Sequence, residues 1–153
     1  MSDSVREKIE TAYKMLLKND SYLLEVDANE RSITHKFAEY LQQIFPQYHV
    51  DCEYNRDGHD SKRLIVELNN LSLTEKDSFD TVYPDIIIHK RGSDINYIVI
   101  EAKKENNEKS YERDKNKLIE YKNILKYQYA FLVLLKNKIN SFDVNDFVIE
   151  INK

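Results

Sequence analysis

Apolar residues recur at helical spacing in three parts of the chain, which predicts three helices. They lie at 4–19, 27–45 and 107–126, where apolar side chains return every three or four residues. Pro46 follows the second range and ends that helix, because proline cannot continue helical hydrogen bonding. The first helix lies within residues 1–26, which are expected to form an N-terminal extension to a core of residues 27–135.

Alternating or continuous apolar runs predict six β-strands. They lie at 48–54, 63–68, 83–90, 95–103, 129–135 and 147–151. The polar segments 55–61 and 69–81 are expected to form a turn and an irregular loop. The run at 129–135 is apolar throughout, which is typical of a strand covered on both faces. Because a helix precedes it, the sheet is expected to be mixed. The 153 residues therefore predict one α/β (α+β) domain, with a mixed central β-sheet flanked by helices.

Two of the predicted strands form a hairpin that carries charged residues. Asp85 opens the first strand, and Glu101 and Lys103 stand at the end of the second. A loop centred on Ser93 places Asp85 opposite Glu101, and Lys103 shares their face because side chains alternate along a strand. A loop of even length would send Asp85 to the other face unless a bulge restored the register. Gly92 suits the positive-φ position of a three-residue loop.

Carboxylates in a buried strand need a chemical reason to be there, because burial of a charge costs free energy. Mg²⁺ takes hard oxygen ligands and uses one or two carboxylates together with water and phosphate. Hydrolysis of a phosphodiester requires an activated nucleophile and neutralisation of the non-bridging oxygens. The pattern therefore predicts that Asp85 and Glu101 bind Mg²⁺ or Mn²⁺ and that Lys103 stabilises the transition state.

The sequence Pro84-Asp85 followed by Glu101-Ala102-Lys103 resembles the signature of the PD-(D/E)xK phosphodiesterase superfamily, also called restriction-endonuclease-like. The resemblance extends over residues 27–135, most of the chain. It implies a restriction-endonuclease-like core and Mg²⁺-dependent hydrolysis of the nucleic-acid backbone. It also implies that the backbone carbonyl of Ala102 is a metal ligand.

Glu30 and His89 each have two interpretations. The superfamily places an acidic residue on the helix that begins near Glu30, which implies that Glu30 completes the metal shell and acts in catalysis. The segment 27–30 also has the form of a capping box, in which Glu30 bonds back to the amide of Asp27. His89 shares strand parity with Asp85, so it is either a neighbour of the site or a packed structural residue.

Several other polar residues are candidates for substrate contact. Asp114, Lys117 and Tyr121 fall on one helical stripe that can face the carboxylates, and Lys117 is the best candidate for contact with a phosphate. An ordinary amphipathic helix with Tyr121 in the core explains the same pattern. Lys104 and Glu53 are further candidates for substrate binding, with surface positions as the simpler interpretation.

Charged residues are distributed unevenly along the chain. The net charge is −4 over the whole sequence. Residues 89–138, however, hold 12 Lys and Arg against 7 Asp and Glu, a net of +5, and this stretch contains the candidate site. Binding to nucleic acid depends on local positive charge and counterion release rather than on the total charge.

Scarce residue types exclude several classes of function. Cys52 is the one cysteine, so neither a disulfide framework nor a cysteine-rich zinc site is expected. The two glycines, Gly58 and Gly92, are too few for a phosphate-binding loop or a dinucleotide fingerprint, and no Gly-x-Ser-x-Gly motif of a serine hydrolase occurs. No apolar run is long enough to span a membrane or to act as a signal, so a cytoplasmic location is expected.

The sequence therefore predicts a Mg²⁺- or Mn²⁺-dependent endonuclease, with DNA favoured as the substrate. A homodimer would bring two sites to the two strands of a duplex. The alternative is a catalytically inactive nucleic-acid-binding or protein-interaction module on the same fold. Metal binding separates the two, because an enzyme of this kind needs the cation.

Overall fold

The computed structural model describes residues 2–26, 29–52, 84–104, 108–135, 144 and 146–152. The helices within them are α1 (Ser2–Glu25), α2 (Glu30–Ile44) and α5 (Glu108–Leu125). The strands are β1 (His49–Cys52), β2 (Ile86–His89), β3 (Asn96–Lys104), β4 (Tyr129–Leu135) and β5 (Val148–Glu150). The strand expected at 63–68, the polar segments 55–61 and 69–81, and the candidate Glu53 lie outside the described residues.

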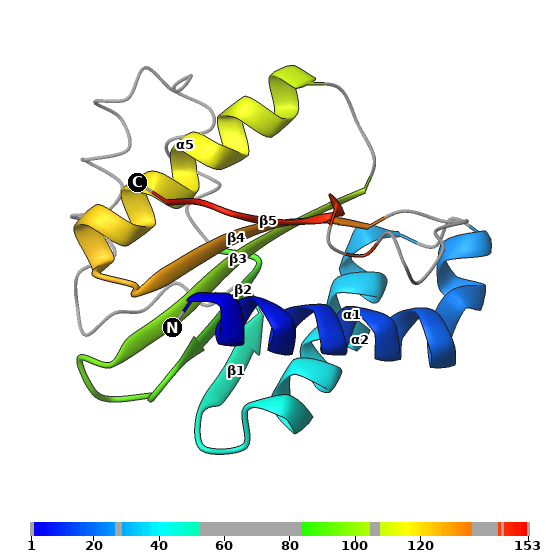
Figure 1. The fold of residues 1–153 in the computed structure, drawn as a ribbon, viewed down its shortest axis with the longest axis horizontal. Coiled ribbons are helices and arrows are strands. Elements are labelled where there is room, and N and C mark those ends of the chain that lie inside the picture. The colour runs from blue at the N-terminus through cyan, green and yellow to red at the C-terminus, as the bar shows by residue number, and fades with distance from the viewer. Residues whose placement is uncertain are drawn as a thin grey trace.

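The five strands form one mixed sheet in the order β1-β2-β3-β4-β5. β3 and β4 are parallel and α5 connects them, whereas the other neighbouring strands are antiparallel. Figure 1 shows α1 and α2 together on one side of the sheet and α5 on the other. The predicted α/β fold with a mixed sheet flanked by helices is confirmed.

Side chains of the sheet divide the core into two hydrophobic clusters. Along β4, the residues that pack in the cluster with α1 and α2 are Phe131, Val133 and Leu135. The alternate residues Ala130, Leu132 and Leu134 pack in the cluster with α5. The prediction that the apolar run 129–135 is covered on both faces is therefore confirmed.

The first helix is longer than its apolar pattern predicts and belongs to the core. α1 continues to Glu25 through non-helical backbone angles at Asp20, whose carboxylate accepts a hydrogen bond from the Tyr40 hydroxyl. The continuation is held because Leu24 is buried in the core cluster. The Tyr13 hydroxyl donates to the Leu134 carbonyl at 2.6 Å, which ties α1 to the sheet. Within the described residues, no helix is both long enough and apolar enough to cross a membrane.

The turn between β2 and β3 has four residues, 91–94, where the sequence predicts three. The Lys90 amide donates to the Ile95 carbonyl at 3.0 Å, and the Ser93 amide donates back to the Lys90 carbonyl at 3.2 Å. Gly92 has φ of +72°, the positive value expected of it. A turn of even length moves the strands out of the register that the candidate site requires.

A β-bulge at Tyr97 restores that register. His89 pairs with Asn96 next to the turn, but Ile88 pairs with Ile98, so Tyr97 is the extra residue on β3. Beyond the bulge, Ile86 pairs with Ile100, and one further step along the same register places the two candidate carboxyls opposite each other. The predicted alignment holds because the turn and the bulge compensate.

Candidate active site

Asp85, directly before β2, and Glu101, in β3, form a hydrogen-bonded pair of carboxyl groups. The side chains of Asp85 and Glu101 are hydrogen-bonded to each other. The Asp85 Oδ2 atom also accepts a hydrogen bond from the Ala102 amide at 2.9 Å. Glu101 is buried, with 3% of its surface exposed, and Asp85 is half-buried. The hairpin thus brings together the two carboxyl groups that the sequence predicts as metal ligands.

The pair holds a proton that isolated carboxyl groups would release. Burial raises the pKa of Glu101 well above its ordinary 4.5, and the negative charge of Asp85 raises it further. Burial also raises the pKa of Asp85, against the lowering effect of its hydrogen bonds with Glu101 and Ala102. Because burial disfavours two negative charges side by side, the two carboxyl groups share a proton across their hydrogen bond.

Helix α5 contributes a third carboxyl group and a lysine to the same face of the sheet. The Lys117 Nζ atom lies 3.8 Å from Glu101 Oε1 and 3.8 Å from Asp114 Oδ1. Lys103 Nζ lies 3.2 Å from Asp114 Oδ2. Asp114 therefore lies between the two lysines. The stripe predicted on this helix faces the carboxyl pair, while its part in substrate contact stays a prediction.

Lys103 has a different partner from the one that the sequence predicts. Strand parity places Lys103 beside Asp85 and Glu101, but its ammonium group pairs with Asp114. Among the described residues, the lysine within ion-pair distance of Glu101 is Lys117. Parity fixes the face from which a side chain leaves the strand, but a long flexible lysine then reaches the nearest anion.

Three buried polar atoms at this site have no hydrogen-bond partner within the described residues. They are Glu101 Oε1, Asp114 Oδ2 and the Tyr121 hydroxyl. Asp114 Oδ2 is within ion-pair distance of Lys103 but lacks hydrogen-bond geometry. Because buried polar atoms are nearly always paired, orphans gathered at one place indicate a site for a polar ligand, ion or water.

Tyr121 belongs to both the core and the site. Its ring is fully buried in the cluster under α5, as the structural interpretation of the helix predicts. Burial raises the pKa of its hydroxyl well above 10.0, and the charges of Glu101, Asp85 and Asp114 raise it further. The hydroxyl therefore stays protonated and can donate a hydrogen bond beside the carboxyl groups.

The sequence did not single out Asp114 as a site residue by itself. It occupies a position on the inner stripe of α5 where apolar residues are expected, between Tyr111 and Leu118. Only 5% of its surface is exposed. An acidic residue on the buried stripe of an amphipathic helix is the signal that identifies it.

Glu30 lies beside the carboxyl pair and does not cap its helix. Asn29 is the N-cap of α2, where its side chain accepts from the Ser32 amide at 2.8 Å. The capping-box interpretation of Glu30 is therefore wrong, since Glu30 is the first helical residue rather than the third. Glu30 Oε2 instead accepts from the Lys104 amide at 3.0 Å, and its charge raises the pKa of Asp85. The described contact of Lys104 here is made by its backbone.

His89 is distant from the site and links β2 to β1. Its Nε2 atom lies 2.7 Å from Asp51 Oδ2, and the Arg91 guanidinium binds the same carboxylate. The hydrogen bond from Arg91 lowers the pKa of Asp51, and His89 adds to this effect. His89 lies four residue steps along the chain from Asp85, a distance of about 13 Å in a strand. Packing and pairing, the structural interpretation of His89, fits this position.

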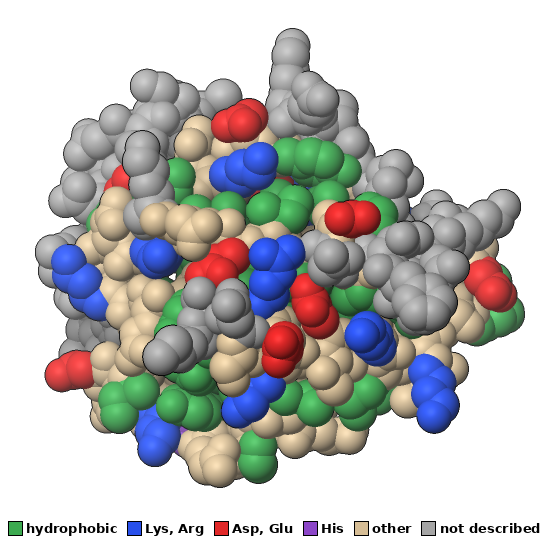
Figure 2. All heavy atoms as spheres, viewed as in Figure 1, with side chains coloured by type: hydrophobic (Ala, Val, Ile, Leu, Met, Phe, Trp, Pro, Cys, Tyr) green, Lys and Arg blue, Asp and Glu red, His purple; other side chains and the backbone are tan. Residues whose placement is uncertain are grey.

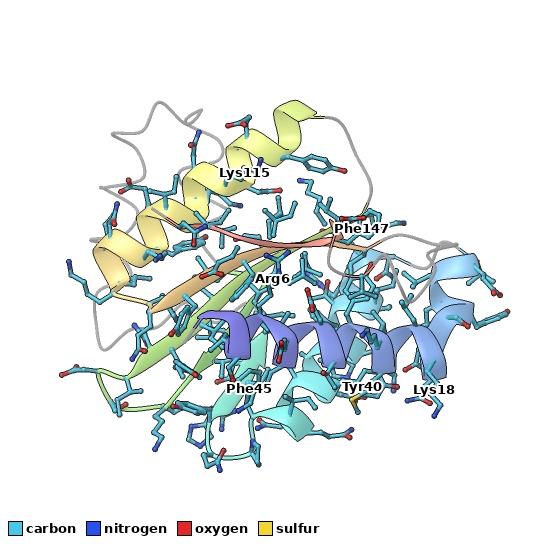
Figure 3. The ribbon with its side chains drawn as sticks, in the orientation of Figure 1. Arg6, Lys18, Tyr40, Phe45, Lys115 and Phe147 are labelled. Carbon is cyan, nitrogen blue, oxygen red and sulfur yellow. The ribbon has the colours of Figure 1, made fainter. Side chains whose placement is uncertain are left out.

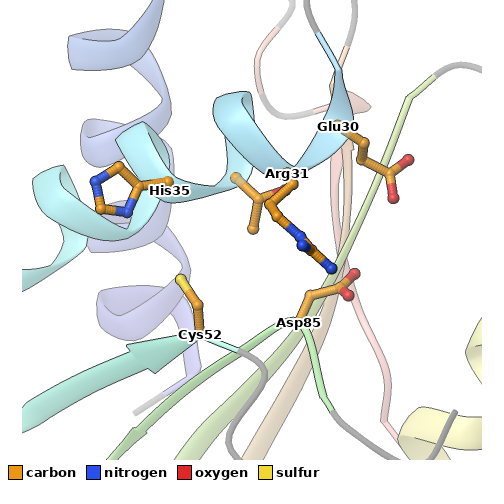
Figure 4. Close-up of a pocket in the computed structure, with 6 residues that line it drawn as sticks. Glu30, Arg31, His35, Cys52 and Asp85 are labelled. Carbon is orange, nitrogen blue, oxygen red and sulfur yellow. The ribbon is translucent and has the colours of Figure 1, made fainter.

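A pocket opens on the other side of Asp85, between α2 and the ends of β1 and β2 (Figure 4). Its volume is about 450 Å³. The residues that line it are Glu30, Arg31, Thr34, His35, Cys52 and Asp85. Asp85 and Glu30 thus connect the pocket with the carboxyl pair.

The donor set can accommodate a divalent cation, although the side chains alone make an incomplete site. The described residues contain no cluster of three or more His, Cys, Asp or Glu side chains arranged to hold a metal ion. Mg²⁺ needs only one or two carboxylates when water and phosphate supply the rest. A bound cation would coordinate the Glu101 Oε1 atom, which accepts no hydrogen bond within the described residues, and would replace the proton shared with Asp85.

Comparisons of the chain with models of protein families, with curated proteins and with solved structures give no match. The interpretation of the site therefore depends on its geometry and chemistry.

Proposed function

We propose that this protein is a metal-dependent nuclease that hydrolyses phosphodiester bonds of nucleic acid, with DNA as the favoured substrate. One observation carries the proposal: two hydrogen-bonded carboxyl groups, one just before β2 and one in β3, lie beside Lys117 of α5, and Asp114 links Lys103 of β3 to the same group. Phosphodiester hydrolysis uses carboxylates to hold a cation and positive groups to neutralise the phosphate.

The proposal includes a restriction-endonuclease-like core. Its support is the order of elements around the site, in which a hairpin carries Pro84-Asp85 and Glu101-Ala102-Lys103 and a crossover helix leads to a parallel strand. Asp85, Glu101 and the Ala102 carbonyl are the proposed metal ligands. Glu30 is adjacent to Asp85 and completes the acidic group.

Each residue of the candidate site has a distinct part in the proposed reaction. Asp85 and Glu101 would hold Mg²⁺ or Mn²⁺, which supplies an acidified water molecule and draws charge from the phosphate oxygens. Lys117 is protonated, because Glu101, Asp114 and Asp85 raise its pKa above 10.5 against the lowering effect of burial, and it neutralises the phosphate. Lys103 does the same from the strand. Asp114 keeps the two ammonium groups on one side of the carboxyl pair.

The described surface is compatible with a nucleic-acid substrate that is bound by positive groups near the site. Figure 2 shows acidic and basic side chains side by side on this face of the molecule. Attraction for the phosphate backbone would therefore come from local positive groups, among them the basic stretch 89–138, and from the bound cation, rather than from the net charge of the whole protein. A homodimer would present two such sites to a duplex.

Cleavage of nucleic acid by the purified protein is expected in Mg²⁺ or Mn²⁺, and EDTA should abolish it. Lys103→Ala should reduce the rate about a hundredfold, because it removes one charge that stabilises the transition state. Plasmid DNA, linear duplex, single-stranded DNA and RNA should be compared as substrates. Lys115→Ala is the matched control, on the α5 helix (Figure 3). Equal loss of activity in both lysine variants would contradict the assigned role of Lys103.

A catalytically inactive binding module is the second candidate function, because the positive and negative groups of the site already neutralise one another. Lys103 and Lys117 already lie within ion-pair distance of Asp114, and Asp85 and Glu101 share a proton. A module of this kind could bind nucleic acid or a protein without needing a cation.

Metal binding separates the two candidates. The nuclease proposal expects Mn²⁺ to raise the melting temperature of the protein, and Asp85→Ala to remove this shift. Asp85→Asn, which retains an oxygen acceptor for the Ala102 amide, separates loss of charge from loss of that hydrogen bond. Asp94→Ala, in the exposed turn, is the control. A Mn²⁺-dependent shift that persists unchanged in both Asp85 variants would place the cation elsewhere.

A further inference from the structure

The pocket beside Asp85 has a chemical character of its own. Two of its lining residues, Asp85 and Glu30, belong to the acidic site, and each carboxylate already accepts a hydrogen bond from a backbone amide of β3. Arg31, Thr34 and His35 come from α2, and Cys52 comes from the end of β1. These four residues have no part in the proposed chemistry.

Arg31 supplies positive charge to this pocket. Figure 4 shows its side chain extending from α2 toward Asp85. A guanidinium presents a planar fork of donors that matches two phosphate oxygens. An anion at Arg31 would therefore lie next to a phosphodiester that is held at Asp85.

Size and polarity of the pocket suit one nucleotide. Its volume of about 450 Å³ lies within the range of pockets that hold small organic ligands. Thr34 is mostly buried, and its hydroxyl can donate or accept, while the exposed His35 offers an imidazole at the rim. These groups can bind the sugar and the base edge of a nucleotide whose phosphate is bound by Arg31.

We propose that this pocket binds the nucleotide unit adjacent to the phosphodiester at Asp85 and Glu101, with Arg31 on the neighbouring phosphate. The proposal rests on the proposed nuclease function, since it assigns one strand of nucleic acid both to the pocket and to the carboxyl pair. It names a binding subsite and assigns no chemical step to these residues.

Cys52 allows the subsite to be tested without any cleavage. It is the one cysteine of the sequence, it is exposed, and it lines the pocket. The rate at which iodoacetamide alkylates Cys52 should fall when the pocket is occupied. The measurement uses the whole protein in EDTA, with dTMP, UMP or inorganic phosphate at millimolar concentrations, and Cys52→Ser gives the background.

Either nucleotide is expected to slow the alkylation, and inorganic phosphate at the same concentration to slow it much less. Arg31→Gln should raise the nucleotide concentration needed for half-protection about tenfold, because a charge-assisted phosphate contact is lost. Arg6→Gln removes the same charge from α1, outside the pocket (Figure 3), and should behave as the wild type. A difference between dTMP and UMP would support the subsite and show which sugar it prefers.

Three results would overturn the subsite: alkylation unaffected by either nucleotide, protection by inorganic phosphate equal to that by nucleotides, or equal weakening by Arg31→Gln and Arg6→Gln. Failure here is distinct from failure of the nuclease proposal. Metal-dependent cleavage without protection of Cys52 would retain the nuclease and remove the subsite. Protection by nucleotides without cleavage of any substrate would retain the subsite and remove the nuclease.

Discussion

Glu101→Gln is expected to abolish metal-dependent cleavage and, at the same time, to stabilise the folded protein at neutral pH. Cleavage should fall about a thousandfold, because a neutral amide cannot replace the carboxylate as a metal ligand. Stability should rise by about 2 kcal/mol at pH 7, because the glutamine needs no proton to lie in this buried position. Its amide can also donate a hydrogen bond to the Asp85 carboxylate, the hydrogen-bond partner of Glu101.

The pH dependence of this effect has a definite sign. The folded pKa of Glu101 lies well above 4.5, so the folded protein binds a proton that the unfolded chain releases. Its contribution to stability is fully present below about pH 4.5 and is lost as pH rises toward the folded pKa, by up to about 1.4 kcal/mol per pH unit. Glu101→Gln removes this slope.

Urea unfolding of the two proteins between pH 4.5 and pH 8 measures the difference. Glu112→Gln, at an exposed position on α5, is the matched control and should leave both the cleavage and the slope unchanged. Identical pH profiles for wild type and Glu101→Gln would show that Glu101 does not hold a proton in the folded state.

Lys117→Met is expected to be the most destabilising change at the site. Lys117 is largely buried and lies within 3.8 Å of both Glu101 and Asp114. Removing it leaves these acidic groups without their shared cation, at a cost of about 3 kcal/mol. Cleavage should fall as well, because a phosphate would lose the same positive charge. Thermal or urea unfolding at pH 7 measures the loss, and Lys115→Met is the control on the same helix.

A double variant separates electrostatics from packing. If Lys117 acts through its charge, combining Lys117→Met with Asp114→Asn should restore part of the lost stability, since the buried acid that loses a cation is then neutral. Strictly additive effects would indicate that Lys117 acts through the packing of its aliphatic chain. The pKa of Lys117 is raised in the folded protein. Its contribution to the stability of the fold is therefore present below about pH 10.5 and is lost as the pH rises through the folded pKa.

The sequence is sufficient to predict the carboxyl pair because its alignment depends on local rules. Apolar residues fix which strands are buried, and parity fixes which residues share a face. The prediction of a three-residue loop was nevertheless wrong, and the alignment of Asp85 with Glu101 depends on the bulge at Tyr97. Neither Tyr97 nor its neighbours carry a sequence signal for a bulge.

Such local rules do not predict which partners the charged side chains have in the folded protein. Periodicity places Asp114 and Lys117 on one stripe of α5, but only the packing of that helix over β3 brings Lys117 to Glu101 and Asp114 to Lys103. Glu30 shows the same limit. Its local spacing favours a capping box, whereas the folded chain offers it the Lys104 amide from a distant strand.

The compensation between turn and bulge has a consequence for how this chain can vary in length. A single-residue insertion or deletion in the segment 91–94 would, alone, rotate every residue of β2 to the opposite side of the sheet relative to β3. Loss of the extra residue at Tyr97 would do the same. Both changes made together would leave Asp85 facing Glu101. This hairpin therefore tolerates length changes in pairs, and a designer who shortens the turn must also straighten the strand.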